Sequence, residues 1–418
     1  MTALLESLQT AFAATAPSKT ALAEAMATGL PGPRTEQWKY TSLRPLSARR
    51  FSAPSSLLAE LNAPTKEIVA AIAAPRIVFV NGVFAADHSS LSDLPQGITV
   101  QSNSHHEPED DARFAAAHDI FAKLNAAIAT QGLQIQVAEN ADAGAAVHAV
   151  FVSVHTGQDL AIHYRHEIEL GKNSKLELIE HHLSQDSQQQ LVNTLCDIAL
   201  QDGAELSHAR IQQDNAGNSQ FLRTEASLQS HAVYRRLDLE LGAHLSRHDL
   251  QVKLLGDGSA VHANGSLIAS GRRHIDTRLD IQHIAKNTSC NLLWRGLATD
   301  RGRAVFHGGI LIEKGADGAD AQLSNKNLLL SDNAEIDTQP VLVIHADEVT
   351  ASHGATVGRL DAGHLFYLRA RGIPEAQAKA MLTNAFCKQT LQVLGKEDLI
   401  AQVAPSLEKA LQAIEVQA

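Results

Sequence analysis

The chain has 418 residues, of which 44% are apolar, 19% charged and 4% aromatic, fractions that exclude disorder and collagen. Its formal charge is −11, and the densest basic spots are two isolated pairs, Arg49 with Arg50 and Arg272 with Arg273. These pairs are too few to follow a phosphate backbone, so nucleic acid is not expected as a partner. At roughly 100 to 200 residues per domain, the length predicts two to four folding units.

No membrane segment or export signal is expected. The longest apolar stretch, residues 68–80, is interrupted by Pro75 and Arg76 and is shorter than the ~18 to 20 residues that a membrane span requires. The N-terminal residues lack a basic segment and include Glu6, which is typical of an amphipathic helix and not of a signal peptide. We therefore expect a cytoplasmic protein.

The first part of the chain is expected to be helical and then mixed. Apolar residues recur at helical spacing from Leu4 to Phe12 and from Leu22 to Leu30. Residues 76–84 place two short apolar runs around Asn-Gly, a strong signal for a β-hairpin because both turn residues tolerate positive φ.

A polar connector is predicted over residues 105–111, followed by a helix over residues 114–129, where apolar residues again have helical spacing. These elements complete a predicted N-terminal helical and small α/β region at residues 1–145.

Residues 146–358 are predicted to form the largest unit, which is mainly β. Short β-rich runs alternate with polar corners of Gly, Asp or Asn, as in residues 168–178, 198–206, 252–261 and 328–336. A sandwich, a barrel and a parallel β-helix all fit runs of this length. The corners share a loose form that hairpin loops would not need to repeat, which favours the parallel β-helix.

Residues 359–418 are predicted to form a C-terminal helical domain. Helical spacing returns at Leu365 and continues beyond Pro374, which suits the first turn of a helix, and an amphipathic helix is expected from Leu399 to Ile414. The predicted layout is therefore a helical and mixed segment, a long β unit and a helical tail.

Motifs for nucleotide binding and hydrolysis are absent from the sequence: no P-loop, no G-x-G-x-x-G between a strand and a helix, no G-x-S-x-G and no H-E-x-x-H occurs. The three cysteines are far apart and form no disulfide or Cys-x-x-Cys framework. Cys196 and Cys387 occur in apolar surroundings and are expected to pack as small hydrophobic residues, while Cys290 is a candidate functional thiol.

Two histidines are candidate functional residues. Small residues surround His353 in the run from Ala351 to Gly358, which leaves its imidazole uncovered, and imidazole binds iron, zinc and copper. The alternative is that His353 only occupies a tight turn. His274 lies two residues before Asp276, so both would share one face of a strand. A buried hydrogen-bonded pair inside the β stack is the favoured interpretation for this second group.

The chain carries the motif S-H-G-A-T-V-G at 352–358, followed by L-F-Y-L at 365–368 and R-G-I at 371–373. These motifs resemble the C-terminal signature of the SufB/SufD family, and specifically of its SufD branch. The motif R-T-E-Q-W-K-Y-T at 34–41 resembles its N-terminal element, and V-N-G at 80–82 also matches. Further similarity occurs at Gly309, residues 325–330, Pro340 and residues 346–347.

The resemblance implies a non-catalytic scaffold subunit of the SufB, SufC and SufD complex, which assembles iron–sulfur clusters. It implies pairing with a SufB-type paralogue through the β-helices and docking of a SufC-type ABC ATPase on the C-terminal helical domain. For the ATPase we expect a surface between about Leu365 and Leu394, with these contact residues: Leu365, Phe366, Tyr367, Arg371, Met381 and Phe386.

The resemblance also implies that His353 belongs to a cluster site shared with SufB. Many relatives carry Cys just before the Ser-His pair, whereas this chain has Ala351, so no thiol is expected there. Iron–sulfur clusters usually take about four ligands, mostly Cys, so the isolated chain is not expected to hold a cofactor stably. We expect a transient cluster that is shared with SufB. Two further options are that reduced flavin binds in the complex and that the isolated chain forms a homodimer.

Two other functions remain open at this point. A stand-alone β-helix enzyme acting on carbohydrate would need clustered acids or an Arg in a groove, and no such cluster is evident. A sulfur acceptor of the SufB kind would need the N-terminal cysteine cluster that many SufB proteins carry, and this chain lacks it.

Overall fold

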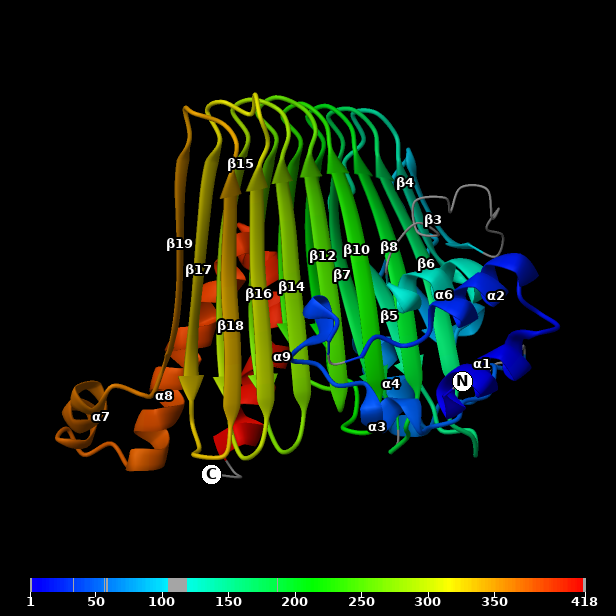
Figure 1. The fold of residues 1–418 in the computed structure, drawn as a ribbon, viewed down its shortest axis with the longest axis horizontal. Helices are drawn as coiled ribbons and strands as arrows, with labels where there is room; N and C mark the ends of the chain where they lie inside the picture. Colours follow the sequence, from blue (N-terminus) through cyan, green and yellow to red (C-terminus); the bar gives the residue numbers. More distant parts are fainter. Residues whose placement is uncertain are drawn as a thin grey trace.

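The computed structural model describes residues 2–415 except 33, 56, 58, 104–118 and 186. Its centre is a parallel β-helix of about eight turns, with helices at both ends of the sequence packed around it (Figure 1). The predicted fold class, mainly β with a central parallel β-helix, is therefore confirmed. The predicted connector at 105–111 lies outside the described residues, as does the first part of the helix predicted at 114–129.

Each turn of the β-helix contributes one strand to each of two sheets. In the ten-stranded sheet the order is β19-β17-β15-β13-β11-β9-β7-β5-β1-β2. Its strands are β1 (Arg76–Val80), β2 (Val83–Phe84), β5 (Val147–Ser153), β7 (Lys175–Ser184), β9 (Glu205–Gln212), β11 (Val233–Glu240), β13 (Ala260–Ala269), β15 (Ser289–Ala298), β17 (Asp320–Leu329) and β19 (Thr350–Gly358). The predicted hairpin is confirmed, since β1 and β2 pair antiparallel around Asn81-Gly82.

The nine-stranded sheet has the order β18-β16-β14-β12-β10-β8-β6-β4-β3. Its strands are β3 (Ile98–Asn103), β4 (Gly132–Val137), β6 (Ala161–Leu170), β8 (Leu191–Leu200), β10 (Ser219–Leu228), β12 (Leu245–Leu254), β14 (His274–His283), β16 (Arg303–Ile312) and β18 (Glu335–Ile344). Within the described part of the chain, β3 and β4 are the antiparallel pair of this sheet, and its other neighbouring strands are parallel. Because β1, β3 and β4 already extend the two sheets, the sheets begin before residue 146; the domain boundaries stay a prediction.

The space between the sheets is filled by side chains stacked in register. Along one row, Leu176, Leu206, Tyr234, Val261, Cys290, Ala321 and Ala351 are successive partners in neighbouring strands. All but Ala351 are buried in the largest apolar cluster, and Ala351 packs against it. Alternate residues of each strand therefore point into the lumen, and the intervening residues point outward.

One corner of the β-helix repeats the same backbone conformation in six turns. A residue with positive φ occurs there each time, and a small buried residue follows it directly. The six pairs are Asn173-Ser174, Gly203-Ala204, His231-Ala232, Gly258-Ser259, Asn287-Thr288 and Gly318-Ala319. Gly or Asn suits positive φ, and a small residue lets the next strand start inside the lumen. This is the recurring corner form that the sequence indicated.

Helices cover the outer face of the nine-stranded sheet near its first turns (Figure 1). They are α1 (Ala3–Phe12), α2 (Lys19–Thr28), η1 (Glu36–Trp38), α3 (Arg44–Ser47) and α6 (Ile120–Ile128). Two further helices, α4 (Ala63–Ala71) and η2 (Ala86–His88), lie elsewhere in the N-terminal region. The predicted N-terminal helices are thus present. Phe121 of α6 stacks on Phe221 of β10, with ring centroids 3.7 Å apart.

The segment at 34–41 is held on this face by Trp38 and Thr41. The guanidinium of Arg247 lies 3.9 Å from the centroid of the Trp38 ring, and Thr41 Oγ1 donates to Asp276 Oδ2 at 2.6 Å. Thr41 also contacts His274 Nε2 at 2.9 Å. The expectation that His274 and Asp276 lie inside the β stack is therefore wrong, because Ile275 occupies the lumen and its two neighbours point outward under the N-terminal segment.

The C-terminal helices are α7 (Ala362–Arg369), α8 (Glu375–Lys388), η4 (Gln389–Leu394) and α9 (Glu397–Glu415). Helices α8, η4 and α9 pack on the opposite outer face, that of the ten-stranded sheet, whereas α7 projects to the side of the β-helix (Figure 1). Leu399, Val403, Leu407 and Leu411 of α9 form one buried stripe against the sheet. None of the helices in the described residues is long and apolar enough to span a membrane.

A single glycine on the lumen face provides a test of this packing. A Cβ added at Gly265 of β13 would lie 2.0 Å from Cζ3 of Trp294, whose side chain is fully buried. We expect Gly265→Ala to lower the free energy of unfolding by about 1 to 3 kcal/mol, since the indole has no space to move into. The midpoint of guanidinium unfolding, followed by circular dichroism, measures this change.

The matched control is Gly354→Ala, a second glycine within a strand, where an added Cβ meets no atom within 4 Å. The free energy of unfolding of Gly354→Ala, obtained from its midpoint, should lie within about 0.5 kcal/mol of the wild-type value. Equal midpoints for the two variants would contradict the packing described for Trp294.

Candidate functional site

The last turn of the β-helix is open. Among the described residues, strand β18 pairs only with β16 and strand β19 only with β17, so each is the edge of its sheet. Both strands have half-buried and exposed residues in place of the buried core of earlier turns, and Val343, Ile344 and Val357 are 41 to 43% exposed. Such edges present unpaired backbone N–H and C=O groups to whatever approaches them.

His353 lies on this edge with its side chain on the lumen side of the sheet. It is the register partner of Leu323, which is buried in the lumen, and Ala351, two residues earlier, packs against the same cluster. Because there is no further turn above it, His353 is exposed. An added Cβ at Gly354 or at Gly358 would meet no atom within 4 Å, so this chain's own packing does not require those glycines.

A short chain of amides supports the strand that carries His353. Asn327 Nδ2 donates to the carbonyl of Thr356 at 3.0 Å and to Asn325 Oδ1 at 2.6 Å. Thr338 of β18 donates to the same Asn325 Oδ1 at 2.7 Å, so the network joins β17, β18 and β19. Our sequence analysis missed this role; the signal was the Asn-x-Asn spacing, which puts both amides on one face of a strand.

None of the cysteines is exposed. Cys196, Cys290 and Cys387 have at most 2% of their surface exposed. Burial raises the pKa of the Cys290 thiol to about 12 and that of Cys387 to about 12, so neither is a thiolate near neutral pH. Cys290 lies two strands below Ala351 in the same inward-facing row. Its candidacy as a functional thiol stays a prediction.

The predicted ATPase-docking residues divide into two groups. Phe366, Tyr367 and Met381 are 73%, 55% and 46% exposed, and Arg371 stacks over the Tyr367 ring with its guanidinium carbon 3.4 Å from the centroid. Leu365 and Phe386 are half-buried. None of the residues of helix α7 is buried, although the helix carries several apolar side chains. Exposed apolar side chains that lie next to one another often mark a contact with another protein.

The second half of the predicted docking surface is occupied by this chain's own packing. Leu391 and Leu394 are buried against the ten-stranded sheet. Asn264 Nδ2 donates to the carbonyl of Thr390 at 2.9 Å, and Ser266 Oγ lies 2.9 Å from Thr390 Oγ1, so two buried polar contacts anchor η4 to β13. Exposed apolar residues therefore concentrate on α7 and the first half of α8.

A cleft of about 600 Å³ separates α7 from the body of the molecule. Leucines from β15, β17, α7 and α9 line it together with polar residues of α8: Leu297, Leu329, Leu330, Leu365, Leu411, Glu375 and Lys379. Only residues 359–361 separate α7 from β19, so the exposed helix is tied closely to the strand that carries His353.

Comparisons with known proteins agree on one family. Residues 151–386 match the model described as the SufBD core domain of SUF system FeS cluster assembly, and residues 10–148 match the SufBD protein N-terminal region. The chain is 30% identical over 399 residues to the iron-sulfur cluster assembly protein SufD of Escherichia coli, covering 93% of this chain and 91% of the relative. It is also 30% identical over 377 residues to a SufBD family protein of Synechocystis sp., covering 87% and 83%.

The amide network predicts how firmly the edge strand is held. Replacing Asn327 by Ala removes the bond to Thr356 and both bonds to Asn325, which keeps only its bond from Thr338, at a cost of about 1 kcal/mol in local stability. Backbone amides of residues 350–358 should then exchange with deuterium about fivefold faster. Gln322→Ala, on the exposed face of the same strand, should leave this exchange at the wild-type rate. Unchanged exchange in Asn327→Ala would show that the network does not hold β19.

Proposed function

The chain belongs to the SufBD family of iron–sulfur cluster assembly proteins, and we propose that it acts there as a non-catalytic scaffold subunit. In this proposal it pairs with a SufB-type paralogue and binds a SufC-type ABC ATPase, and clusters form transiently at the interface with the paralogue. The proposal places the chain in the cytoplasm, where its three free cysteines would stay reduced.

The observation that carries the proposal is the open edge with His353. Strands β18 and β19 have ten and nine residues, and each lacks a partner on one side in the described part of the chain. A second β-helix could continue the sheets across these edges through main-chain hydrogen bonds. The space beside Gly354 and Gly358, which this chain does not fill, supports close approach of another backbone.

The ligand count supports a shared cluster site. Clusters are usually held by about four ligands, mostly thiolates, and all three thiols of this chain are buried. His353 is exposed and can offer one imidazole nitrogen, so the partner would have to supply the remaining ligands. The partnership with reduced flavin stays a prediction of the family resemblance.

Helix α7 is the part of the C-terminal domain that best fits an ATPase partner. Phe366 and Tyr367 are adjacent exposed aromatic residues, and aromatic residues dominate the binding energy of many interfaces. The cleft beneath α7 could receive an apolar side chain from the partner, and the exposed ion pair of Lys379 with Glu375 lies at its rim.

The role of His353 predicts a separation between assembly and activity. The complex of the coexpressed chains should still form with His353→Ala, because the side chain is exposed and its loss leaves no cavity. Cluster formation on anaerobic reconstitution should fall by about tenfold or more, since even residues that only orient metal ligands contribute factors of 10 to 100. Absorbance of the reconstituted complex near 420 nm, with iron and sulfide analysis, measures the loss.

His155→Ala is the matched control, because His155 is also exposed but follows β5, far from the open end. His353→Cys should restore part of the cluster content, since thiolate also binds iron. If His353→Ala matured clusters at the wild-type rate, the proposed role of this residue would be wrong while the scaffold function would still stand.

The docking proposal predicts a second, independent phenotype. The double variant Phe366→Ala with Tyr367→Ala should lose at least tenfold in affinity for the ATPase, as expected when two aromatic contacts of about 1 to 2 kcal/mol each are removed. The Tm of the isolated chain should not change, because both side chains are exposed. Copurification and titration calorimetry measure the binding.

Ile68→Ala serves as the control, since Ile68 is 54% exposed on α4 in the N-terminal region. Point variants are preferable to deletion of the C-terminal helices, because deleting α9 would expose the apolar face of the ten-stranded sheet. Wild-type ATPase binding by the double variant would refute α7 as the docking element. The carbohydrate-enzyme alternative has no observation in its favour among the described residues.

A further inference from the structure

The middle turns of the β-helix contain charged side chains inside the lumen. Four carboxylates (Glu180, Asp214, Asp238 and Glu240) and two guanidinium groups (Arg210 and Arg236) are at most 3% exposed. They form one network: Arg210 pairs with Glu240, Arg236 pairs with Asp238, and His208 joins Arg236 to Glu180. With the imidazoles neutral, this network has a formal charge of −2, and an uncompensated charge inside a protein is costly.

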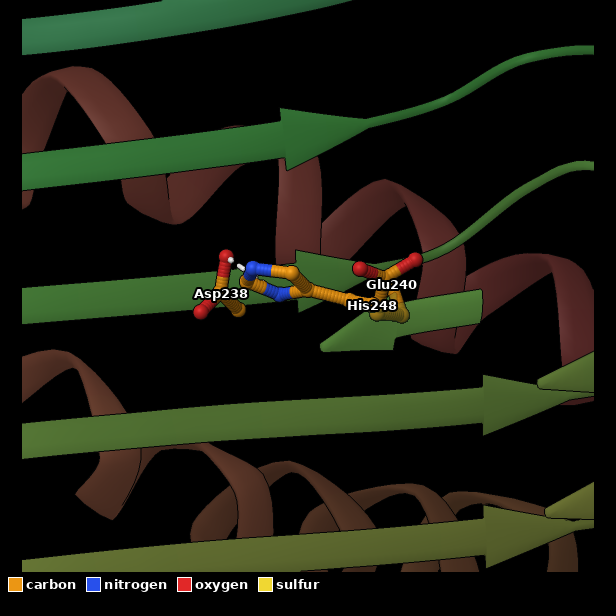
Figure 2. A group of neighbouring side chains, drawn as sticks. All are labelled: Asp238, Glu240 and His248. Atoms are coloured by element: carbon orange, nitrogen blue, oxygen red, sulfur yellow. Dashed lines mark ion pairs between the residues drawn. The ribbon is translucent and has the colours of Figure 1, made fainter. Parts of the chain in front are cut away.

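Three potential metal ligands meet in this network (Figure 2). Asp238 and Glu240 come from β11 of one sheet, and His248 comes from β12 of the other, so the sheets face each other across this point. One ligand atom from each residue lies within 4.8 Å of the others. His248 Nδ1 is 3.6 Å from Asp238 Oδ1. That separation is too long for a good hydrogen bond and close to the ~3.4 Å between two ligands of a tetrahedral ion with bonds of about 2.1 Å.

The imidazole of His248 is oriented as a metal ligand would be. His248 is completely buried, and its Nδ1 atom has no hydrogen-bond partner among the described residues. Nε2 lies 3.1 Å from Thr224 Oγ1, to which it can donate, and this bond would leave the Nδ1 lone pair free. The neighbouring residue in the same row, Thr277, is also fully buried with an unpartnered hydroxyl. Unpartnered buried polar atoms point to a missing ion or water.

The two carboxylates retain capacity for a cation. Glu240 accepts from Arg210 through one oxygen and from Ser246 Oγ, at 2.7 Å, through the other. Asp238 accepts from Arg236 Nη2 at 2.6 Å through Oδ1, and Arg236 Nε is shared between Oδ1 at 3.0 Å and Oδ2 at 3.1 Å. Both oxygens of Glu240 and Oδ2 of Asp238 keep a second lone pair, and metal-binding carboxylates are commonly held in place by such outer hydrogen bonds. One divalent cation would also neutralise the formal charge of the network.

We propose that Asp238, Glu240 and His248 bind one divalent first-row transition metal ion inside the β-helix. One imidazole nitrogen and two carboxylates suit zinc, manganese or ferrous iron. Thr277 or a water molecule would complete the coordination. This site is separate from the open end and from His353, and it revises the expectation that the isolated chain holds no metal stably, because β11 and β12 assemble ligands that local sequence does not bring together.

Because all three ligands are buried, the ion should enter as the chain folds and should resist chelators afterwards. The test uses the full chain expressed with added zinc and dialysed against EDTA under native conditions, which strips surface sites. Unfolding in guanidinium with the chromophoric chelator 4-(2-pyridylazo)resorcinol should then release about one equivalent of metal per chain. Release of less than a tenth of an equivalent from wild type would overturn the proposal and favour a buried water.

Two variants assign the metal to this site. His248→Gln removes the imidazole ligand and should reduce the released metal to less than a tenth of an equivalent. His283→Gln replaces another completely buried histidine, bonded to Thr288 Oγ1 at 2.8 Å and outside the network, and should still release about one equivalent. Equal release from both variants would overturn the assignment. If His248→Gln fails to fold, Glu240→Gln takes its place and should also release less than a tenth of an equivalent of metal. The amount of metal released from the wild-type chain tests the proposal by itself.

Discussion

The structure depends on strict stacking of one turn of the β-helix on the next. At the repeated corner, residues with a side chain alternate with glycine: Asn173, Gly203, His231, Gly258, Asn287 and Gly318. A Cβ at Gly203 would lie 2.4 Å from Asn173 Oδ1, and one at Gly318 would lie 2.3 Å from Asn287 Oδ1. The side chain of one turn thus occupies the space that glycine leaves in the next. Because the corner keeps register, every strand places the same alternate residues in the lumen.

That register decides which side chains fill the lumen and which lie on the outer faces, and these regions differ in composition and in what covers them. The lumen is apolar over most of its length, but its middle turns hold the buried network of carboxylates, guanidinium groups and imidazoles. The outer faces are covered by this chain's own helices, through Trp38 and Arg247 on one sheet and through the α9 stripe on the other. The last turn has no such cover, and its exposed strands are the natural place for an assembly contact.

The candidate functional features also divide into accessible groups at the open end and buried groups in the lumen. His353, the open edges and α7 are accessible: His353 could offer a cluster one ligand, the edge strands leave hydrogen bonds unmade in the described residues, and no residue of α7 is fully buried. The proposed metal ligands within the lumen are the opposite case, since Asp238, Glu240 and His248 all come from one chain and are buried. The proposed scaffold role would need a rigid support for the open edge, and the Asn325 and Asn327 amides bond directly to β19.

Local sequence alone determined the hairpin, the terminal helices, the recurring corners and the uncovered imidazole of His353, because backbone preferences and short periodic patterns act over a few residues. The proposed partners came from the family resemblance and not from local sequence. Only the tertiary structure decided which neighbours meet across turns. His274 and Asp276 were correctly placed on one strand face, but the direction of that face depended on Ile275 filling the lumen. Leu391 lay within the predicted docking surface, but the structure buries it against the ten-stranded sheet and α9. Asp238 and His248 lie on opposing sheets, and no local pattern records a contact that is made by stacking one turn upon another.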